Sequence, residues 1–569
     1  MRKIFSLPIL VIFLIIGTEL FVGAVSVEQK PYTTYTYSYD DLKEQPTAKA
    51  YVPTKVIYGE DLNCGSLKGP KDIFVDAEKD IYYIADTGNN RVLTVDSNNK
   101  CINELTTFDN NGISDSIKTP EGICIDNNGY LFIADSGNNR LLKFDSNYNL
   151  VHEYTKPDST LFGNENPFKP IKVSVDEHGN IYLVCEGIYQ GIVEIDENGE
   201  FVGFLGANKT NPSLWDRFWQ SVSTQAQRKN MQSFIPVAFT NIDLDESNFL
   251  LATAQLENNQ SNSGVKRLNL GGVDVIKTND QIPMIGDISN TNSGSITGKS
   301  SFSDICYVSD GIFAVTDITR GKIFFYNEDG DLLFCFGSGG SQSGNIMSPS
   351  AIDANGLNIY VLDSNLNQIT IFEPTAYCET MFLAVKSYRE GNYDLSNKYY
   401  NQLIKQNSNC EFAYIGIGKA ELRNGNYKAA MQSFKLANNK QYYSSALKGY
   451  RKQIIEKIFI PIFFIILALI LFLILRPVFK KRYSGKIKNG STGKPRPVLS
   501  GMEHGMYLVL HPFKGYSDIK YENAGNFTAC GIIFLIYTAS LIFKAYSTGF
   551  LFMSANENSV NVFLEIATA

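Results

Sequence analysis

Several residue types that build catalytic and metal sites are scarce in this chain of 569 residues. It has only 4 histidines and 2 tryptophans, and its 9 cysteines show no Cys-x-x-Cys spacing. The cysteines therefore do not predict a zinc site of the usual kind. No Gly-x-Ser-x-Gly nucleophile elbow stands in a convincing context. The formal net charge of −7 argues against nucleic acid as a partner.

What the chain does contain is a repeat. Pro70, Pro120 and Pro170 lie fifty residues apart, and each opens a similar segment. The first two copies share the sequence Ile-Ala-Asp-(Thr/Ser)-Gly-Asn-Asn-Arg, which begins at Ile84 and at Ile133. Repetition at a fixed period of this length is typical of repeat architectures.

Each unit contains four short strand-like runs separated by turn residues. In the first unit we expect strands over 72–75, 81–85, 91–96 and 102–108. Further copies begin at residues 120, 170, 236, 304 and 349. Four-stranded sheets that pack radially form a β-propeller. The last copy has no room for an outer strand, so we expect residues 54–58 to pair into it and close the ring.

The two Asp-x-Gly-Asn-Asn-Arg signatures resemble NHL repeats, which form six-bladed propellers. The resemblance covers residues 50–374 and is specific in the first two copies. It predicts a multidomain chain whose first large domain is an all-β six-bladed β-propeller.

Acidic residues recur where each predicted second strand ends. They are Asp86, Asp135, Glu186, Asp317 and Asp363. Equivalent positions form a ring in a propeller, and a ring of carboxylates could hold Ca²⁺. The same carboxylates could instead pair with Arg91, Arg140 and Arg320, and we favour this pairing. The turns that carry them favour a structural role, because Gly and Asn tolerate positive φ and Asp caps its own turn.

Some related propellers are enzymes. Those that resemble peptide-amidating lyases need a zinc site rich in histidine, whereas His152 and His178 fall in an outer strand and in a turn. Lactonase-like propellers use a divalent metal held by carboxylates. A metal-dependent lactonase or hydrolase is therefore the alternative function, and the main expectation is a protein without a catalytic site or a required cofactor.

Residues 212–231 form an insertion between the third and fourth copies. Trp215, Phe218 and Trp219 fall at helical spacing on one face, with Arg217 beside them. This face could pack on the propeller. Alternatively it could anchor a protein or a glycan, because Trp dominates binding hot spots.

Residues 375–457 change to a helical period. Gly391-Asn392-Tyr393 recurs thirty-four residues later as Gly425-Asn426-Tyr427. The second copy resembles a tetratricopeptide repeat, with Gly418, Ala430 and Phe434 at the matching spacings. We expect two such repeats and a connecting helix, supported by the propeller or by another subunit. Cys378 and Cys410, near the starts of the two leading helices, could pair or could remain thiols.

Residues 458–475 are apolar without interruption and would span roughly 27 Å as a helix. They predict a transmembrane helix. Residues 476–496 hold eight Lys or Arg and no acid, which places the basic linker 476–510 in the cytoplasm. Residues 1–24 read as a secretory signal peptide, followed by a linker over 25–49. Both signals place the propeller and the helical repeats outside the cell.

Residues 511–569 resemble the start of a Yip-family membrane domain. The resemblance rests on His511-Pro512-Phe513-Lys514-Gly515-Tyr516 and on a second apolar span over 527–543. Such domains have several spans, so the chain looks truncated. The combination resembles bacterial proteins that join NHL repeats to a Yip-type domain. It implies a membrane-anchored binding or scaffolding protein with a protein or glycan partner, accessory to a transport system.

Overall fold

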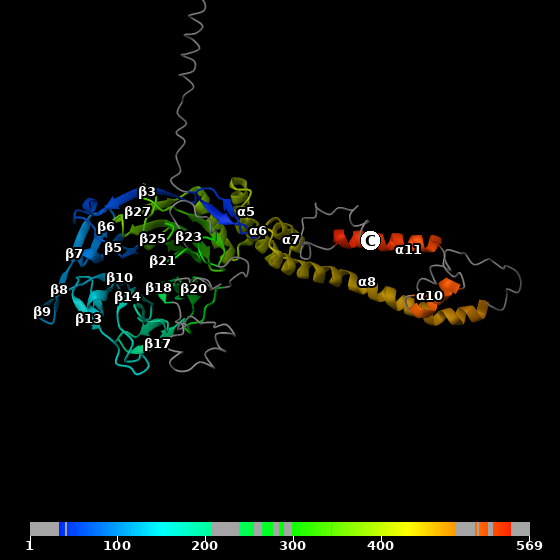
Figure 1. The fold of residues 1–569 in the computed structure, drawn as a ribbon, viewed down its shortest axis with the longest axis horizontal. Coiled ribbons are helices and arrows are strands. Elements are labelled where there is room, and N and C mark those ends of the chain that lie inside the picture. Colours follow the sequence, from blue (N-terminus) through cyan, green and yellow to red (C-terminus); the bar gives the residue numbers. More distant parts are fainter. Residues whose placement is uncertain are drawn as a thin grey trace, which may run out of the picture. The chain divides into compact units, whose positions relative to one another are not determined.

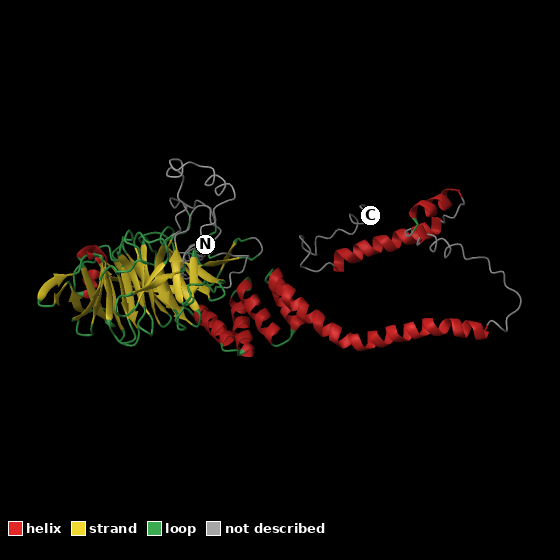
Figure 2. Cartoon of the chain, turned by 90° about the horizontal axis from the view of Figure 1, so that it is seen from below, coloured by secondary structure: helices red, strands yellow, loops and turns green. Residues whose placement is uncertain are grey.

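The structure, a computed structural model, describes residues 33–39, 42–206, 238–254, 264–276, 284–288, 299–342, 344–483, 507–508, 511–521 and 527–547. The chain divides into two compact units, residues 1–417 and residues 418–569. Figure 1 labels the elements along the chain, and Figure 2 shows where strands give way to helices.

The first unit contains a six-bladed β-propeller, as the repeat predicts. Each blade is an antiparallel sheet whose first strand faces the centre of the ring. Blade one consists of β4 (Asp72–Asp76), β5 (Ile81–Asp86), β6 (Arg91–Asp96) and β7 (Cys101–Leu105). Blade two consists of β10 (Pro120–Ile125), β11 (Leu131–Asp135), β12 (Arg140–Phe144) and β13 (Leu150–Tyr154). Blade three consists of β14 (Pro170–Val175), β15 (Ile181–Cys185), β16 (Ile192–Ile195) and β17 (Phe201–Leu205). Blade four consists of β18 (Phe239–Leu244), β19 (Leu250–Ala254) and β20 (Val265–Leu268). Blade five contains β21 (Phe302–Ser309), β22 (Ile312–Asp317), β23 (Lys322–Asn327) and β24 (Leu332–Phe336). Blade six consists of β25 (Pro349–Asn355), β26 (Asn358–Asp363), β27 (Gln368–Pro374) and β3 (Tyr51–Tyr58).

The ring closes through β3 (Tyr51–Tyr58), which pairs antiparallel with β27 in blade six. This confirms the predicted closing strand, which begins three residues earlier than expected. The N-terminal part of the propeller thus completes the C-terminal blade, and the pairing covers an edge that would otherwise be open.

The outer strand of blade one is shorter than predicted. It ends at Leu105 opposite Val92, because β6 begins at Arg91 and offers no ladder partner further on. The following residues form a separate hairpin of β8 (Thr107–Asn110) and β9 (Ile113–Ser116).

Part of the predicted linker 25–49 is ordered structure. Strands β1 (Tyr35–Tyr37) and β2 (Glu44–Pro46) extend blade five, with β1 paired to β24. The Tyr37 hydroxyl donates to Asp287 Oδ1 at 2.5 Å, and the Thr36 hydroxyl donates to the carbonyl of Leu332 at 3.2 Å. Buried hydroxyls with partners of this kind hold the added strands in place.

Helices follow the last blade. They are α4 (Ala376–Arg389), α5 (Tyr393–Gln406), α6 (Glu411–Arg423), α7 (Tyr427–Leu436), α8 (Lys440–Tyr483), α10 (Pro512–Tyr521) and α11 (Phe527–Ser547). The first of these helices shares a hydrophobic core with blades five and six, where Met381 and Phe382 of α4 join Phe325 and Phe372. The propeller therefore supports this helix, as expected. Cys378 and Cys410 are both buried thiols in the structure, in line with the alternative that they remain thiols.

The helices of the second unit also pack closely. A Cβ atom at Gly418 would lie 2.5 Å from the Phe434 ring, and one at Gly449 would lie 2.4 Å from the Tyr427 ring. Small residues thus permit the approach of α7 to its neighbours, as the spacing predicts. The assignment of these helices to tetratricopeptide repeats stays a prediction.

The predicted spans fall on α8 and α11. Among the described residues, no helix is long and apolar enough to cross a membrane, so the two spans over 458–475 and 527–543 are not supported. The side chains of residues 469–470 and 472–475 lie outside the described residues. So do the predicted signal peptide 1–24, residues 484–506 of the basic linker and the end of the Yip-like segment, 548–569.

Candidate functional site

The central cavity of the propeller is the best-defined polar site in the described part of the chain. It measures about 60 Å³ and is lined by the first strands of all six blades. Each inner strand contributes two or three neighbouring residues to the lining. The charged residues among them are Asp72, Lys172, Asp243, Asp304 and Asp353.

Lys172 supplies the positive charge in this lining. Its Nζ lies 2.6 Å from Asp72 Oδ1, and both side chains are about nine-tenths buried. Lys172 belongs to blade three and Asp72 to blade one, so the pair reaches across blade two. Gly122 occupies the equivalent position in blade two, where a Cβ would come within 2.8 Å of the Lys172 Cα. The absence of a side chain there leaves room for the ion pair.

The four carboxylates connect successive blades. In each case the Oδ2 atom accepts a hydrogen bond from a backbone N–H on the inner strand of the next blade. The bonds join Asp72 to Ile123 at 2.8 Å, and Asp243 to Tyr307, Asp304 to Ile352 and Asp353 to Val75 at 2.6 Å. Charge-assisted bonds of this length are among the stronger hydrogen bonds in proteins. The ring is therefore tied together at its centre.

Burial perturbs the ionisation of this cluster. Burial raises the pKa of Asp304 to about 7, although the nearby Lys172 opposes the shift. Burial likewise raises the pKa of Asp243 to about 6, and it raises that of Asp353 well above the usual range. For Lys172, burial lowers the pKa but the charges of Asp72 and Asp304 outweigh it, so the net shift is upward. Lys172 therefore stays charged while part of the acid cluster holds protons near neutral pH.

The predicted acids at the ends of the second strands lie elsewhere, in the turns. Asp86 Oδ2 accepts from Arg91 Nε at 2.7 Å, and Asp135 Oδ2 accepts from Arg140 Nε at 2.8 Å. The pairing that we favoured is thus confirmed for two of the three arginines. The third expectation is wrong, because Arg320 pairs with Asp287 at 2.7 Å.

Each of these turns is also held by backbone hydrogen bonds. Asp86 Oδ1 accepts from the N–H of Lys68 at 2.8 Å, and Asp135 Oδ1 accepts from that of Lys118 at 2.7 Å. A Cβ at Gly88 would come within 2.4 Å of the Lys68 carbonyl, which explains the glycine of the motif. The repeated motif therefore anchors the loop that leads into its own blade.

The other three predicted acids are held separately. Glu186 is exposed and pairs with Lys169. Asp317 Oδ1 accepts from the N–H groups of Ser301 and Thr319, and Asp363 accepts from four backbone N–H groups of its own blade. Among the described side chains, no group of three or more His, Cys, Asp or Glu could hold a metal ion. The calcium site stays a prediction that this geometry does not favour.

The remaining predicted sites are the aromatic insertion and the two histidines of the propeller. Trp215, Arg217, Phe218 and Trp219 lie outside the described residues, so the partner site remains a prediction. His152 lies in β13, and His178 lies in the turn between β14 and β15. Both histidines are where the sequence placed them.

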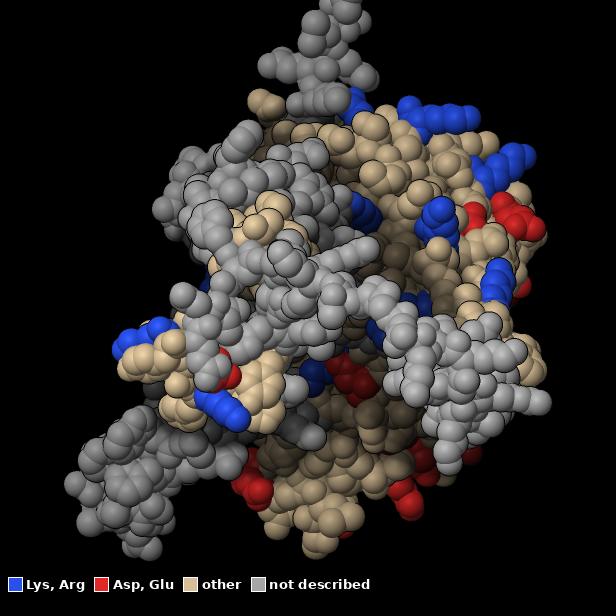
Figure 3. Space-filling model, turned by 90° about the vertical axis from the view of Figure 1, so that its right-hand side faces the viewer, with Lys and Arg blue, Asp and Glu red and all other residues tan. Residues whose placement is uncertain are grey.

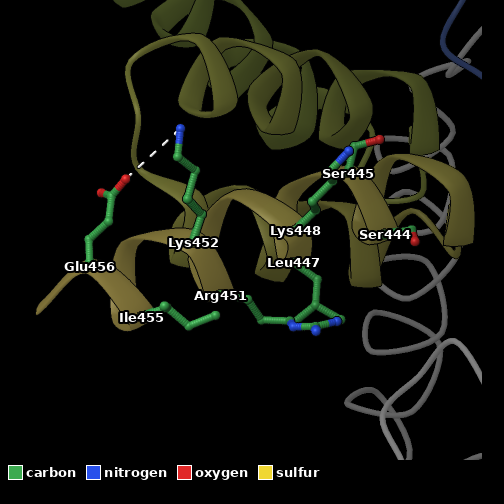
Figure 4. Close-up of a pocket in the computed structure, with 8 residues that line it drawn as sticks. All are labelled: Ser444, Ser445, Leu447, Lys448, Arg451, Lys452, Ile455 and Glu456. Atoms are coloured by element: carbon green, nitrogen blue, oxygen red, sulfur yellow. Dashed lines mark ion pairs between the residues drawn. The ribbon is translucent and has the colours of Figure 1, made fainter. Parts of the chain in front are cut away.

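The second unit carries a larger pocket of about 670 Å³ along α8 (Figure 4). Its lining includes Lys448, Arg451 and Lys452 together with Leu447 and Ile455. The Lys452 ammonium and the Glu456 carboxylate reach toward each other, 3.9 Å apart. On the face drawn in Figure 3, basic and acidic side chains of the described residues form separate small groups, without one continuous patch of either sign.

Sequence reasoning missed the charged residues of the central cavity. Asp72 and Lys172 each stand two residues after a proline that opens a repeat, and Gly122 stands at the same place in the copy between them. The available signal was that two of these three copies carry a charged residue at the same position after the proline, on the strand that faces the centre of the ring. Their meeting across the ring depends on the closed circle of blades.

Comparison with known proteins found one matching family and several similar solved structures. Residues 118–144 match the NHL repeat family. No curated protein matches the chain. Similar solved structures include virginiamycin B lyase from Staphylococcus aureus, at 14% identity over 56% of this chain and 99% of that one, with a TM-score of 0.34. Kuenenia stuttgartiensis hydrazine synthase is similar at 12% identity over 55% of this chain and 97% of that one, with a TM-score of 0.33. We draw no functional conclusion from these two likenesses.

Proposed function

We propose that this protein is a binding or scaffolding protein that presents its propeller to a protein or glycan partner. The observation that carries this proposal is that the central cavity is small and that its carboxylates already accept hydrogen bonds. Pockets for small molecules usually measure roughly 300–1,000 Å³, whereas this cavity measures about 60 Å³. Its four carboxylates accept backbone hydrogen bonds that join the blades. For the propeller, we therefore propose the outer surface and the loops as the binding surface.

The second part of the proposal is attachment to a membrane through α8. Ile458 to Leu467 include nine Ile, Leu or Phe side chains that are 43–65% exposed. Exposed apolar surface of this extent is unusual in a protein surrounded by water. The basic residues Lys448, Arg451, Lys452 and Lys457 lie directly before this segment. We propose that the propeller and helical repeats lie outside the cell and that the basic linker 476–510 lies in the cytoplasm.

Membrane attachment is tested by alkaline carbonate extraction of membranes from cells that make the full chain. The wild type should stay in the pellet. A variant with Phe463→Lys and Ile466→Lys should move to the supernatant, because charged side chains oppose insertion. Leu161→Lys serves as the matched control, since Leu161 is an exposed residue of the propeller. Release of the wild type by carbonate would contradict the proposal.

The partner site is proposed at the insertion 212–231. A photo-crosslinker placed at Ser213 of the full chain should give a discrete adduct, or a glycan array should show a defined signal. Either result should be lost in Trp215→Ala/Trp219→Ala and retained in Leu161→Ala. Signals that survive the tryptophan changes would place binding elsewhere.

The same preparation separates binding from hydrolysis. Stoichiometric Ca²⁺ uptake that disappears in Asp135→Ala would favour the metal-dependent lactonase or hydrolase. Isothermal titration with Ca²⁺ measures this directly. We expect no such uptake, because Arg140 and a backbone N–H already occupy the Asp135 oxygens.

A further inference from the structure

Two partly exposed cysteines lie next to each other where the ring closes. Cys64 follows the short helix η1 (Gly59–Leu62) that continues from β3, and Cys101 is the first residue of β7. Both side chains pack against the same hydrophobic cluster. The Cys64 thiol donates to the carbonyl of Gly59 at 3.9 Å, and the Cys101 thiol donates to the carbonyl of Asn103 at 3.2 Å. Both are free thiols in the structure. The pair thus joins the closing segment of blade six to the outer strand of blade one.

Two further contacts fix this neighbourhood. The Lys100 ammonium donates to the carbonyl of Asp61 at 2.9 Å. Arg91 Nη1 donates to the carbonyl of Cys64 at 2.7 Å and to Glu104 Oε1 at 3.2 Å. The segment before Cys64 and the strand that starts at Cys101 are therefore held side by side at both ends.

The other cysteines differ in burial. Six of them are buried, namely Cys124, Cys185, Cys306, Cys335, Cys378 and Cys410, and Cys530 is exposed in the second unit. Cys64 and Cys101 alone among the nine have intermediate exposure. A soluble oxidant can therefore reach a pair of adjacent thiols at this one place in the propeller.

We propose that Cys64 and Cys101 form a disulfide that fastens the segment after β3 to the outer strand of blade one. With a disulfide oxidant such as oxidised glutathione, one cysteine attacks the oxidant and releases one glutathione thiol. The second cysteine then displaces the other glutathione. The two cysteines lose two protons and two electrons, and the oxidant takes up both as two thiols. This inference does not rest on the proposed function.

The crosslink stabilises the folded ring by restricting the unfolded chain between residues 64 and 101. It also holds the segment after β3 against the outer strand of blade one. Burial and the neighbouring Cys101 raise the pKa of Cys64 to about 12. Since the thiolate is the attacking species, exchange should be slow at neutral pH and faster in mild alkali.

The test uses the purified full chain, incubated with oxidised glutathione at mildly alkaline pH and then alkylated. Trypsin cuts after Lys68 and Lys100, so the two cysteines end in different peptides. Mass spectrometry should find these two peptides joined, with a mass lower by two hydrogen atoms. The thermal midpoint should rise by several degrees on oxidation in the wild type and in the control Cys530→Ser.

Neither change should occur in Cys64→Ser or in Cys101→Ser. The use of both variants keeps the test valid if one of them fails to fold. Absence of the joined peptides after oxidation of the wild type would overturn the proposal. An equal rise of the thermal midpoint in the wild type and the serine variants would also overturn it.

Discussion

The ion pair at the centre of the propeller allows a quantitative prediction. Replacement of Lys172 by Met removes the cation that lies 2.6 Å from Asp72 Oδ1. At an effective dielectric constant of 20, the lost attraction is about 6 kcal/mol. Relief of the cost of burying the ammonium offsets part of it, and breaking a buried pair typically costs about 3–5 kcal/mol. We therefore expect Lys172→Met to lower the free energy of unfolding by about 3–5 kcal/mol at pH 8.

The matched control is the exposed pair of Lys79 and Asp76. Their charged atoms are 2.9 Å apart, but the Lys79 side chain is 51% exposed. Lys79→Met should therefore cost less than about 1 kcal/mol. The double variant Lys172→Met/Asp72→Asn should recover part of the loss, because it removes the uncompensated carboxylate.

Guanidinium unfolding of the full chain, followed by circular dichroism, measures these differences. The loss in Lys172→Met should be smaller at pH 5 than at pH 8, since protonation of Asp72 removes the unpaired charge. If Lys172→Met and Lys79→Met shift the transition equally at pH 8, the central pair is effectively hydrated. Burial would then not strengthen the ion pair.

Other predictions concern pH and packing. Because burial raises the pKa of Asp304 to about 7, the folded chain keeps a proton that the unfolded chain releases above about pH 4. This contribution to the free energy of unfolding is complete below about pH 4 and is lost as the pH rises through about 7. In unfolding experiments, Asp304→Asn should therefore lose less stability than the wild type between about pH 4 and about pH 7. Gly418→Val should disrupt the packing against Phe434 and reduce the helical signal in circular dichroism, whereas Gly531→Ala, in α11 at a site with open space around it and without positive φ, should disturb the helices less. Arg140→Ala should destabilise the propeller by about 3 kcal/mol in the same unfolding experiment, because it leaves buried Asp135 without its cation; a cost equal to that of Lys79→Met would contradict the structural role of the motif.

Much of the propeller could be predicted from local sequence. The fifty-residue period and the alternation within each run specify the strands, and the sequence Asp-x-Gly-Asn-Asn-Arg specifies the turns. Asn90 and Asn139 adopt positive φ, as these turns require. The pairing of Asp86 with Arg91 is also local, because the two residues face each other across a tight turn.

The incorrect predictions concern contacts between distant segments. Arg320 occupies a turn like the others, yet its partner is Asp287, which lies thirty-three residues earlier in the chain. The predicted linker 25–49 contains two strands, because blade five leaves an edge that β1 can join. Such partners are not encoded by spacing within one repeat.

The sequence by itself determined the number of blades, the strand that closes them and the helical region that follows, because these depend on periodicity and on turn chemistry. The tertiary structure alone decided that Lys172 meets Asp72 and that Cys64 meets Cys101. The first pair joins blades one and three, and the second joins the segment before blade one to its outer strand. These contacts depend on how the blades and loops pack, which the spacing within one repeat does not specify.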